Sequence, residues 1–272
     1  MKSYLSLVPI SAKVRKRQNR MTILCVIISI FLVTAIFSVA DMMIRTQSDR
    51  MTGKNGSWHI ELDGISQETA LKIAERDDVV SIGAVTIFNP DGELPYRMDG
   101  KRVVLYGIDE SYLTMNSTGA AEGRFPQGMG EIMLSSNAAR VLQVAVGDTV
   151  TLRTPSGDWD FTVSGLGGVE ESYYSGQYSL MDAYLPRTAF AALMEQNNVH
   201  NLQTSYYVQF TSASKAAKAI PELTAQHNLP ENAVSENTGV MAIAGQSDSS
   251  AAKNVYSLAA VLFVLVLLAG VL

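Results

Sequence analysis

The sequence predicts a membrane protein of the α+β class, with a transmembrane helix on either side of a split α+β extracytoplasmic domain that holds an inserted β-rich subdomain. Three observations lead to this prediction. Residues 21–40 contain no charged side chain and follow a basic segment. A strand, helix, strand pattern in residues 57–107 returns after residue 204, and short strands with Gly/Pro turns lie between. A second uncharged apolar stretch, residues 255–272, closes the sequence.

The stretch Met21–Ala40 is long enough and apolar enough to cross a membrane. Twelve of its twenty residues are Val, Ile, Leu or Phe, and a helix of that length spans about 30 Å, the thickness of the hydrocarbon core. A basic flank stays in the cytoplasm, and here it consists of Lys13, Arg15, Lys16, Arg17 and Arg20. We therefore expect a multi-pass protein of the cell membrane, with a cytoplasmic N-terminus and with residues 41–253 outside the cytoplasm.

A cleaved signal peptide is the alternative interpretation of this segment, because Ser38-Val39-Ala40 resembles a small-residue cleavage site. The apolar stretch exceeds the roughly 7–15 residues of an ordinary signal-peptide core. Twenty residues also precede it, which is long for a leader. Both lengths favour a retained helix.

Charge and cysteine content exclude several classes of protein. The formal net charge is −5, but residues 1–20 hold six basic groups and no acid, which leaves 15 basic against 26 acidic groups in residues 21–272. That part carries a net charge of −11, so we expect no binding to nucleic acid. Cys25 is the only cysteine, and no intrachain disulfide is possible.

Two segments flank the first apolar stretch. Residues 1–20 combine a short amphipathic pattern with the basic block and are expected to lie in the cytoplasm, against the membrane surface. The alternative is a frayed N-terminus interrupted by Pro9. Residues 41–54 contain good helix formers and no breaker before Gly53, which predicts that the helix continues as a stalk.

Residues 55–107 and 205–252 are expected to form the two halves of the α+β domain. Ser66 can cap the first helix, and Pro90 lies in the turn after the second strand. The predicted strands and helices are Ser57–Leu62, Gln67–Arg76, Val79–Phe88, Lys101–Gly107, Tyr206–Phe210, Ala213–His227 and a short strand Ala233–Ser235. We expect strand, helix, strand units of the β-α-β type.

Residues 108–204 are expected to form the β-rich insert. Thr149–Arg153 and Trp159–Leu166 flank a Pro-Ser-Gly-Asp turn and predict a hairpin. Pro186 is expected to open a helix that runs to about Gln196.

Residues 253–272 then read as the start of a second transmembrane helix, cut short, so we expect the chain to be the N-terminal part of a longer membrane protein.

Three runs between residues 106 and 166 carry a family resemblance: YGIDESYLTMN at 106–116, EGRFPQGMGEIMLSSNAARVLQVAVGDTVTL at 122–152 and FTVSGL at 161–166. In this order, behind a first apolar helix, they resemble the external domain of FtsX/MacB-type permeases of ABC transporters. The resemblance implies a permease subunit that dimerises with a second copy or a paralogue and binds a cytoplasmic ABC ATPase, whose cycle moves the external domain. It also implies export of a peptide, antibiotic or lipoprotein, or transmembrane signalling, and no cofactor.

Sequence motifs for catalysis are missing. There is no P-loop, so ATP hydrolysis is expected on a separate polypeptide and the chain itself is not expected to be an enzyme. His59, His200 and His227 have no partner at metal-ligand spacing, so we expect no metal site. The absence of a G-x-S-x-G motif also disfavours a membrane-tethered hydrolase.

One loop is the best candidate for contact with a substrate or partner. It combines acids with aromatic side chains, namely Glu170, Glu171, Tyr173 and Tyr174. Such a pairing suits a cationic or peptidic partner; the alternative is a solvated loop whose tyrosines pack on the adjacent sheet. A two-span sensor, such as a receptor kinase with an external ligand-binding domain, remains the alternative to the permease, since it has the same arrangement of apolar stretches.

Overall fold

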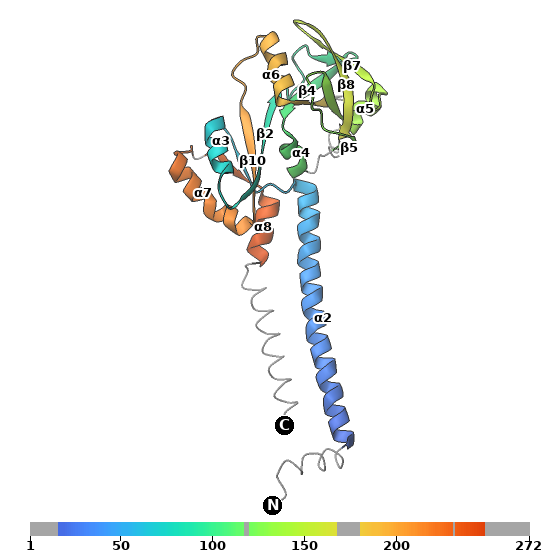
Figure 1. Ribbon diagram of the computed structural model, residues 1–272, viewed down its shortest axis with the longest axis vertical. Helices are drawn as coiled ribbons and strands as arrows, with labels where there is room; N and C mark the ends of the chain where they lie inside the picture. The colour runs from blue at the N-terminus through green and yellow to red at the C-terminus, as the bar shows by residue number, and fades with distance from the viewer. Residues whose placement is uncertain (1–15, 117–119, 168–179, 231, 248–272) are drawn as a thin grey trace, which may run out of the picture. The chain divides into compact units, whose positions relative to one another are not determined.

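The computed structural model describes residues 16–116, 120–167, 180–230 and 232–247 (Figure 1). It divides into two compact units: Met1–Asp49 with Ile243–Leu272, and Arg50–Ala242. The expected apolar stretch at 255–272 lies outside the described residues.

The first described element is a single long helix, α2, Lys16–Asn55. Within it, Arg20–Val39 is long and apolar enough to cross a membrane, and none of this stretch is buried against protein. Phe31, for example, is 70% exposed. One of its polar side chains is satisfied inside the helix, because the Thr34 hydroxyl donates to the Ile30 carbonyl at 2.9 Å. These features suit a helix whose apolar side chains face lipid.

The second unit is a mixed α+β structure in which strands and helices alternate around one 11-stranded sheet. Its described strands are β1 Ile60–Leu62, β2 Val79–Phe88, β3 Arg97–Met98, β4 Lys101–Ile108, β5 Ala120–Gly123, β6 Glu131–Ser135, β7 Thr149–Thr154, β8 Gly157–Gly167, β9 Leu180–Pro186, β10 Thr204–Phe210 and β11 Val234–Glu236. Its helices are α3 Gln67–Ala74, α4 Glu110–Met115, α5 Ser136–Leu142, α6 Arg187–Gln196, α7 Ala213–His227 and the beginning of α8 Thr238–Ser247.

The first four strands of the sheet order, β11-β1-β10-β2, come from both ends of the unit. β10 pairs antiparallel with both β1 and β2, so β1 and β2 are parallel with β10 between them. β1 separates β10 from β11 in the same way. The expected β-α-β units are therefore split: β10 lies between the parallel strands β1 and β2, and β1 lies between the parallel strands β10 and β11.

Six strands, β4, β3, β7, β8, β6 and β9, close a ring, and β5 pairs with β8 beside it. From β4 the order runs β3, β7, β8, β6 and β9, and β9 pairs back with β4 in parallel from Leu180 to Pro186. The expected hairpin is present, since β7 pairs antiparallel with β8 from Thr149 to Thr154. One apolar cluster fills this region, with Leu105, Phe161 and Leu185 almost completely buried.

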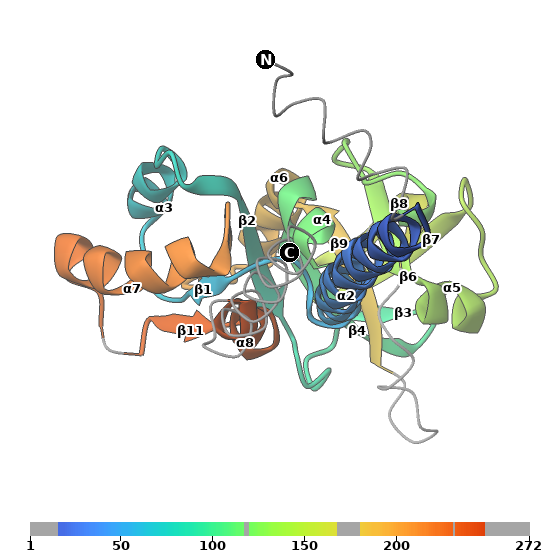
Figure 2. The same ribbon diagram turned by 90° about the horizontal axis from the view of Figure 1, so that it is seen from below.

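A second apolar cluster lies where α3 and α7 contribute side chains to the split units, and includes Ile73, Phe210 and Leu223. Side chains of a strand alternate between faces, so Tyr207 lies on the opposite face from its neighbours Tyr206 and Val208. That opposite face packs against α4. Seen from below in Figure 2, α3 and α7 lie together, apart from α4.

Candidate functional site

The residues singled out from the sequence fall into two groups. Lys16, Arg17 and Arg20 lie in the first turns of α2 with exposed side chains, whereas Lys13 and Arg15 lie outside the described residues. The contact loop with Glu170, Glu171, Tyr173 and Tyr174 also lies outside the described residues.

Asn237 is a buried polar side chain of the second unit with three hydrogen bonds; it lies between β11 and α8 and is 4% exposed. Its amide nitrogen donates to the carbonyls of Asn55 at 3.1 Å and Trp58 at 2.9 Å. Its amide oxygen accepts from the Val240 backbone at 3.3 Å, as a helix cap does. One side chain therefore joins the end of α2 to the start of α8.

The chain between α2 and β1 is held from a second side. Gly56 has a φ of +81°, and a Cβ there would lie 2.6 Å from the Met115 carbonyl oxygen, so only glycine fits without strain. The next backbone N–H, of Ser57, donates to the same Met115 carbonyl at the end of α4. We call Asn55–Trp58 together with Asn237 the helix joint, since both α2 and α8 meet the sheet there.

The Gly107–Asp109 step, part of the run at 106–116 that carries the family resemblance, anchors α4. The Asp109 carboxylate caps α4 by accepting from the Tyr112 backbone at 2.9 Å, and its other oxygen accepts from the Ala84 backbone in β2 at 2.9 Å. Burial raises the pKa of Asp109, although these hydrogen bonds oppose the rise. Gly83 allows the close approach, because a Cβ there would lie 2.5 Å from the Tyr112 nitrogen. The motif fixes α4 against the sheet.

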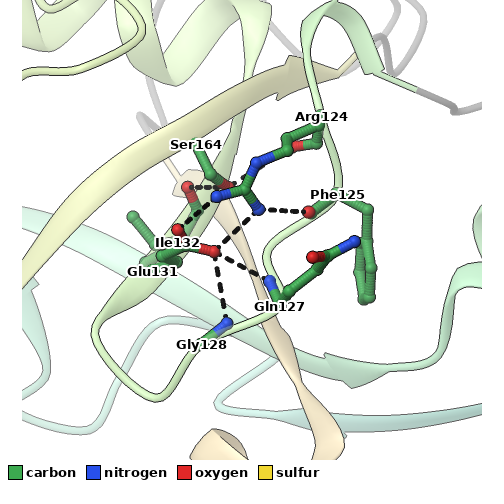
Figure 3. Close-up of polar contacts among 7 residues, drawn as sticks. All are labelled: Arg124, Phe125, Gln127, Gly128, Glu131, Ile132 and Ser164. Atoms are coloured by element: carbon green, nitrogen blue, oxygen red, sulfur yellow. Dashed lines mark hydrogen bonds and ion pairs between the residues drawn. The ribbon is translucent and has the colours of Figure 1, made fainter.

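The Glu-Gly-Arg turn is closed by an ion pair, as Figure 3 shows. The Arg124 guanidinium donates through both terminal nitrogens to the two carboxylate oxygens of Glu131, one of them at 2.9 Å. Glu131 also accepts from the backbone of Gln127 at 2.8 Å and Gly128 at 3.2 Å. Arg124, followed by these backbone donors, lowers the pKa of Glu131 to about 2. The pair and the turn are therefore structural.

Acids and tyrosines meet beside α4. The Tyr207 hydroxyl donates to Glu61 at 2.8 Å, and its ring packs edge-on against Trp58 and Tyr112. Burial raises the pKa of Glu61, and burial with nearby acids raises the pKa of Tyr112 to about 12. The pKa of Tyr207 is raised for the same reasons. Both phenols therefore stay protonated at neutral pH, and the rings of Trp58, Tyr112 and Tyr207 pack together beside α4.

The described residues contain no group of three or more His, Cys, Asp or Glu side chains that could hold a metal ion. His59 is buried and accepts from the Phe210 backbone through Nδ1 at 3.1 Å, and burial lowers its pKa. His200 is an exposed residue whose Nδ1 lies 3.8 Å from Glu195.

The helix joint was not predicted from the sequence. Its signal is an asparagine followed by a helix, Asn237 before Thr238, the usual position of a cap. The two backbone carbonyls that Asn237 binds lie about 180 positions earlier, and no local pattern shows such a pairing.

Comparison with known proteins gives a consistent result. The sequence matches the family described as MacB-like periplasmic core domain over residues 21–226. No curated protein sequence matches the chain. The structure is similar to the periplasmic region of MacB from Actinobacillus actinomycetemcomitans, with 14% identity and a TM-score of 0.51, covering 74% of this chain and 97% of that one. At this identity, the likeness concerns the fold.

Two further structures score lower. The extracellular domain of the noncanonic ABC-type transporter YknZ from Gram-positive bacteria is 15% identical with a TM-score of 0.45, covering 66% of this chain and 98% of that one. A domain of a putative permease protein from Porphyromonas gingivalis is 16% identical with a TM-score of 0.42, covering 67% and 87%.

Proposed function

Because the chain belongs to the family of MacB-like periplasmic core domains, we propose that it acts in an ABC transporter permease that couples ATP hydrolysis on a separate cytoplasmic ATPase to motion of its extracytoplasmic domain. The observation that carries this proposal is the family match, which includes both the apolar stretch of α2 and the domain behind it. A domain of this family has no ATPase activity of its own.

The proposal includes a membrane arrangement. The extracytoplasmic domain comes after the N-terminal apolar helix, and the basic side chains of Lys16, Arg17 and Arg20 mark the cytoplasmic end of that helix. A multi-pass arrangement is also part of the proposal, since residues 255–272 are apolar and uncharged. The proposed partners are the ATPase, the bilayer and a second copy or paralogue, with a peptide, antibiotic or lipoprotein as substrate, or a signal in its place.

The domain division is part of the proposal. Residues 55–107 and 205–252 form the split α+β domain, and 108–204 form the β-rich insert. The strand order supports it, since β1, β2, β10 and β11 interlock, while β3, β4 and β6–β9 form the ring. β4, at residues 101–108, belongs to both regions through its pairing with β2 and with β9.

The helix joint gives the coupling a physical route. A change in the tilt of α2 or α8 acts on the same buried amide, because Asn237 binds Asn55 and also caps α8. Through the backbone of Asn237, which donates to the His59 carbonyl at 2.9 Å, that change reaches the residue directly before β1. We expect the joint to transmit motion of the membrane helices into the sheet.

The test uses the intact protein purified from its native membrane together with the polypeptides that bind it. We expect an ATP-hydrolysing subunit to co-purify. Hydrogen exchange of the backbone at residues 55–59 and 237–240 should then change when ATP and vanadate trap the ATPase. Asn237→Ala should abolish this nucleotide-dependent change while ATP hydrolysis continues.

Asn89→Ala is the matched control, because Asn89 is also a buried amide (5% exposed) that binds two backbone groups, Val103 and Leu94, away from the joint. It should lose stability but keep the nucleotide response. Co-purification with a kinase domain instead of an ATPase would favour the sensor. If trapping leaves exchange at the joint of the native protein unchanged, the coupling route is wrong.

A further inference from the structure

Three arginines stand side by side on the sheet. Arg97 in β3 is the direct partner of Arg102 in β4 and of Arg153 in β7. Directly opposite residues of antiparallel strands point to the same face, with Cβ atoms roughly 5 Å apart, and like charges in that position destabilise the sheet. Such a cluster is unexpected in the acidic part of the chain, residues 21–272, whose net charge is −11.

The guanidinium of Arg97 is fixed in place and only partly used. Its Nη1 donates to the carbonyls of Leu94 at 2.6 Å, Tyr96 at 2.9 Å and Gly92 at 3.5 Å. Its Nη2 and Nε have no partner among the described residues. A guanidinium offers five N–H donors in a rigid plane. Arg97 therefore presents oriented donors that a ligand can use.

Arg153 is available to a ligand because its ion pair is weak. Its nearest acid is Asp158, at 3.6 Å, and the two side chains are 75% and 52% exposed. An ion pair of this kind contributes only about 0–1 kcal/mol, because water screens it. Arg153 can therefore exchange Asp158 for another anion at little cost.

Both arginines line one cavity of about 440 Å³, between β3, β7 and the end of α5. Its wall combines hydroxyl groups, including Thr149, with apolar side chains, including Leu142 and Val144. Asp99 also lines the cavity and is its one acid. The volume lies within the roughly 300–1,000 Å³ that is typical of small-molecule sites, and the wall has a cationic part and an apolar part.

We propose that this cavity binds an organic oxyanion, namely a phosphate or carboxylate group attached to a short apolar chain. Arg97 and Arg153 hold the oxyanion through paired N–H donors, the geometry in which arginine binds both groups. Leu142 and Val144 contact the apolar chain. The ligand is a small molecule recognised outside the helix joint, so this proposal does not depend on the ATPase partner.

The test is titration calorimetry on the full chain in nanodiscs of zwitterionic lipid, with hexyl phosphate, hexanoate, inorganic phosphate and hexanol as probes. We expect saturable 1:1 binding of hexyl phosphate, hexanoate or both, and the stronger of the two tells whether phosphate or carboxylate is preferred. Arg97→Gln and Arg153→Gln should each weaken binding about tenfold. Lys101→Gln removes one positive charge from the same hairpin outside the cavity wall and should leave binding unchanged.

Arg153→Gln keeps the proposal testable even if Arg97→Gln unfolds, because the Arg153 side chain is largely exposed and its loss should not disturb the fold. Three results would overturn the proposal. The first is that neither organic anion binds. The second is that inorganic phosphate or hexanol binds as tightly as the organic anions, and the third is that Arg153→Gln binds them as tightly as the native chain does.

Discussion

Replacing Glu131 by alanine should destabilise the second unit by about 2–3 kcal/mol. The change removes the acceptor of the Gln127 and Gly128 backbone N–H groups and the partner of Arg124. Each backbone bond contributes about 1 kcal/mol, and loss of the ion pair, which water partly screens, adds to this. For a unit of this size, the melting temperature should fall by roughly 5–10 °C.

Thermal unfolding of the full chain in detergent at pH 7, followed by near-ultraviolet circular dichroism, measures this change. Glu122→Ala is the control, since Glu122 is an exposed acid of the same turn without an ion pair among the described residues, and it should shift the melting temperature by less than 1 °C. A shift below 2 °C for Glu131→Ala would show that the turn does not depend on this carboxylate.

The ionisation of Glu131 also predicts how the stability of the fold depends on pH. Its pKa is about 2 in the folded chain, against an ordinary value of 4.5, so folding favours the ionised form. The contribution of Glu131 is complete above pH 4.5 and is lost as the pH falls towards 2. Glu131→Gln should therefore differ most from the native chain at neutral pH, and the two should converge in acid.

Two further predictions concern the sheet face beneath α4. Gly83→Ala should cost about 1–3 kcal/mol in thermal unfolding, because the new Cβ would lie 2.5 Å from the backbone nitrogen of Tyr112. The control is Gly53→Ala in helix α2, where a Cβ meets nothing within 4 Å, and it should be neutral or stabilising by up to ~1 kcal/mol. Equal effects of the two substitutions would contradict the close packing of Gly83 against α4. Burial raises the pKa of Glu61 above 4.5, so the folded chain binds this proton more tightly and stability should fall as the pH rises through that raised pKa. In Glu61→Gln, unfolding measured between pH 4 and 8 should lack this fall, and an unchanged pH profile would refute the assignment.

Local signals predicted many elements of the second unit. Ser66 and Ser135 accept the backbone N–H three residues later, as their position before a helix suggests. The predicted helix Ala213–His227 agrees with α7, although it contains Pro221. The Pro-Ser-Gly-Asp turn joins β7 and β8 as expected. Each of these features depends on residues close together in sequence.

Elements that depend on distant partners were missed or read differently. The strand β5, Ala120–Gly123, has no strand-forming side chains and exists because β8 pairs with it. The β-α-β pattern gave no sign that β10 would lie between β1 and β2, since the choice of strand neighbour depends on long-range packing. The helix α4 did leave a local signal, the cap Asp109, but its six residues are too few for a clear apolar period.

The closed ring of strands has a consequence for solubility. A sheet edge exposes unpaired backbone groups that invite pairing with another chain, and closure removes such edges. Because β9 returns to β4, the ends of the strand order at that side are covered. At the other side the edge strand β11 has only three residues and carries the exposed polar side chains of Ser235 and Glu236. These features limit edge-to-edge aggregation at the ring and at β11, while β5, paired with β8, adds a short edge of four residues.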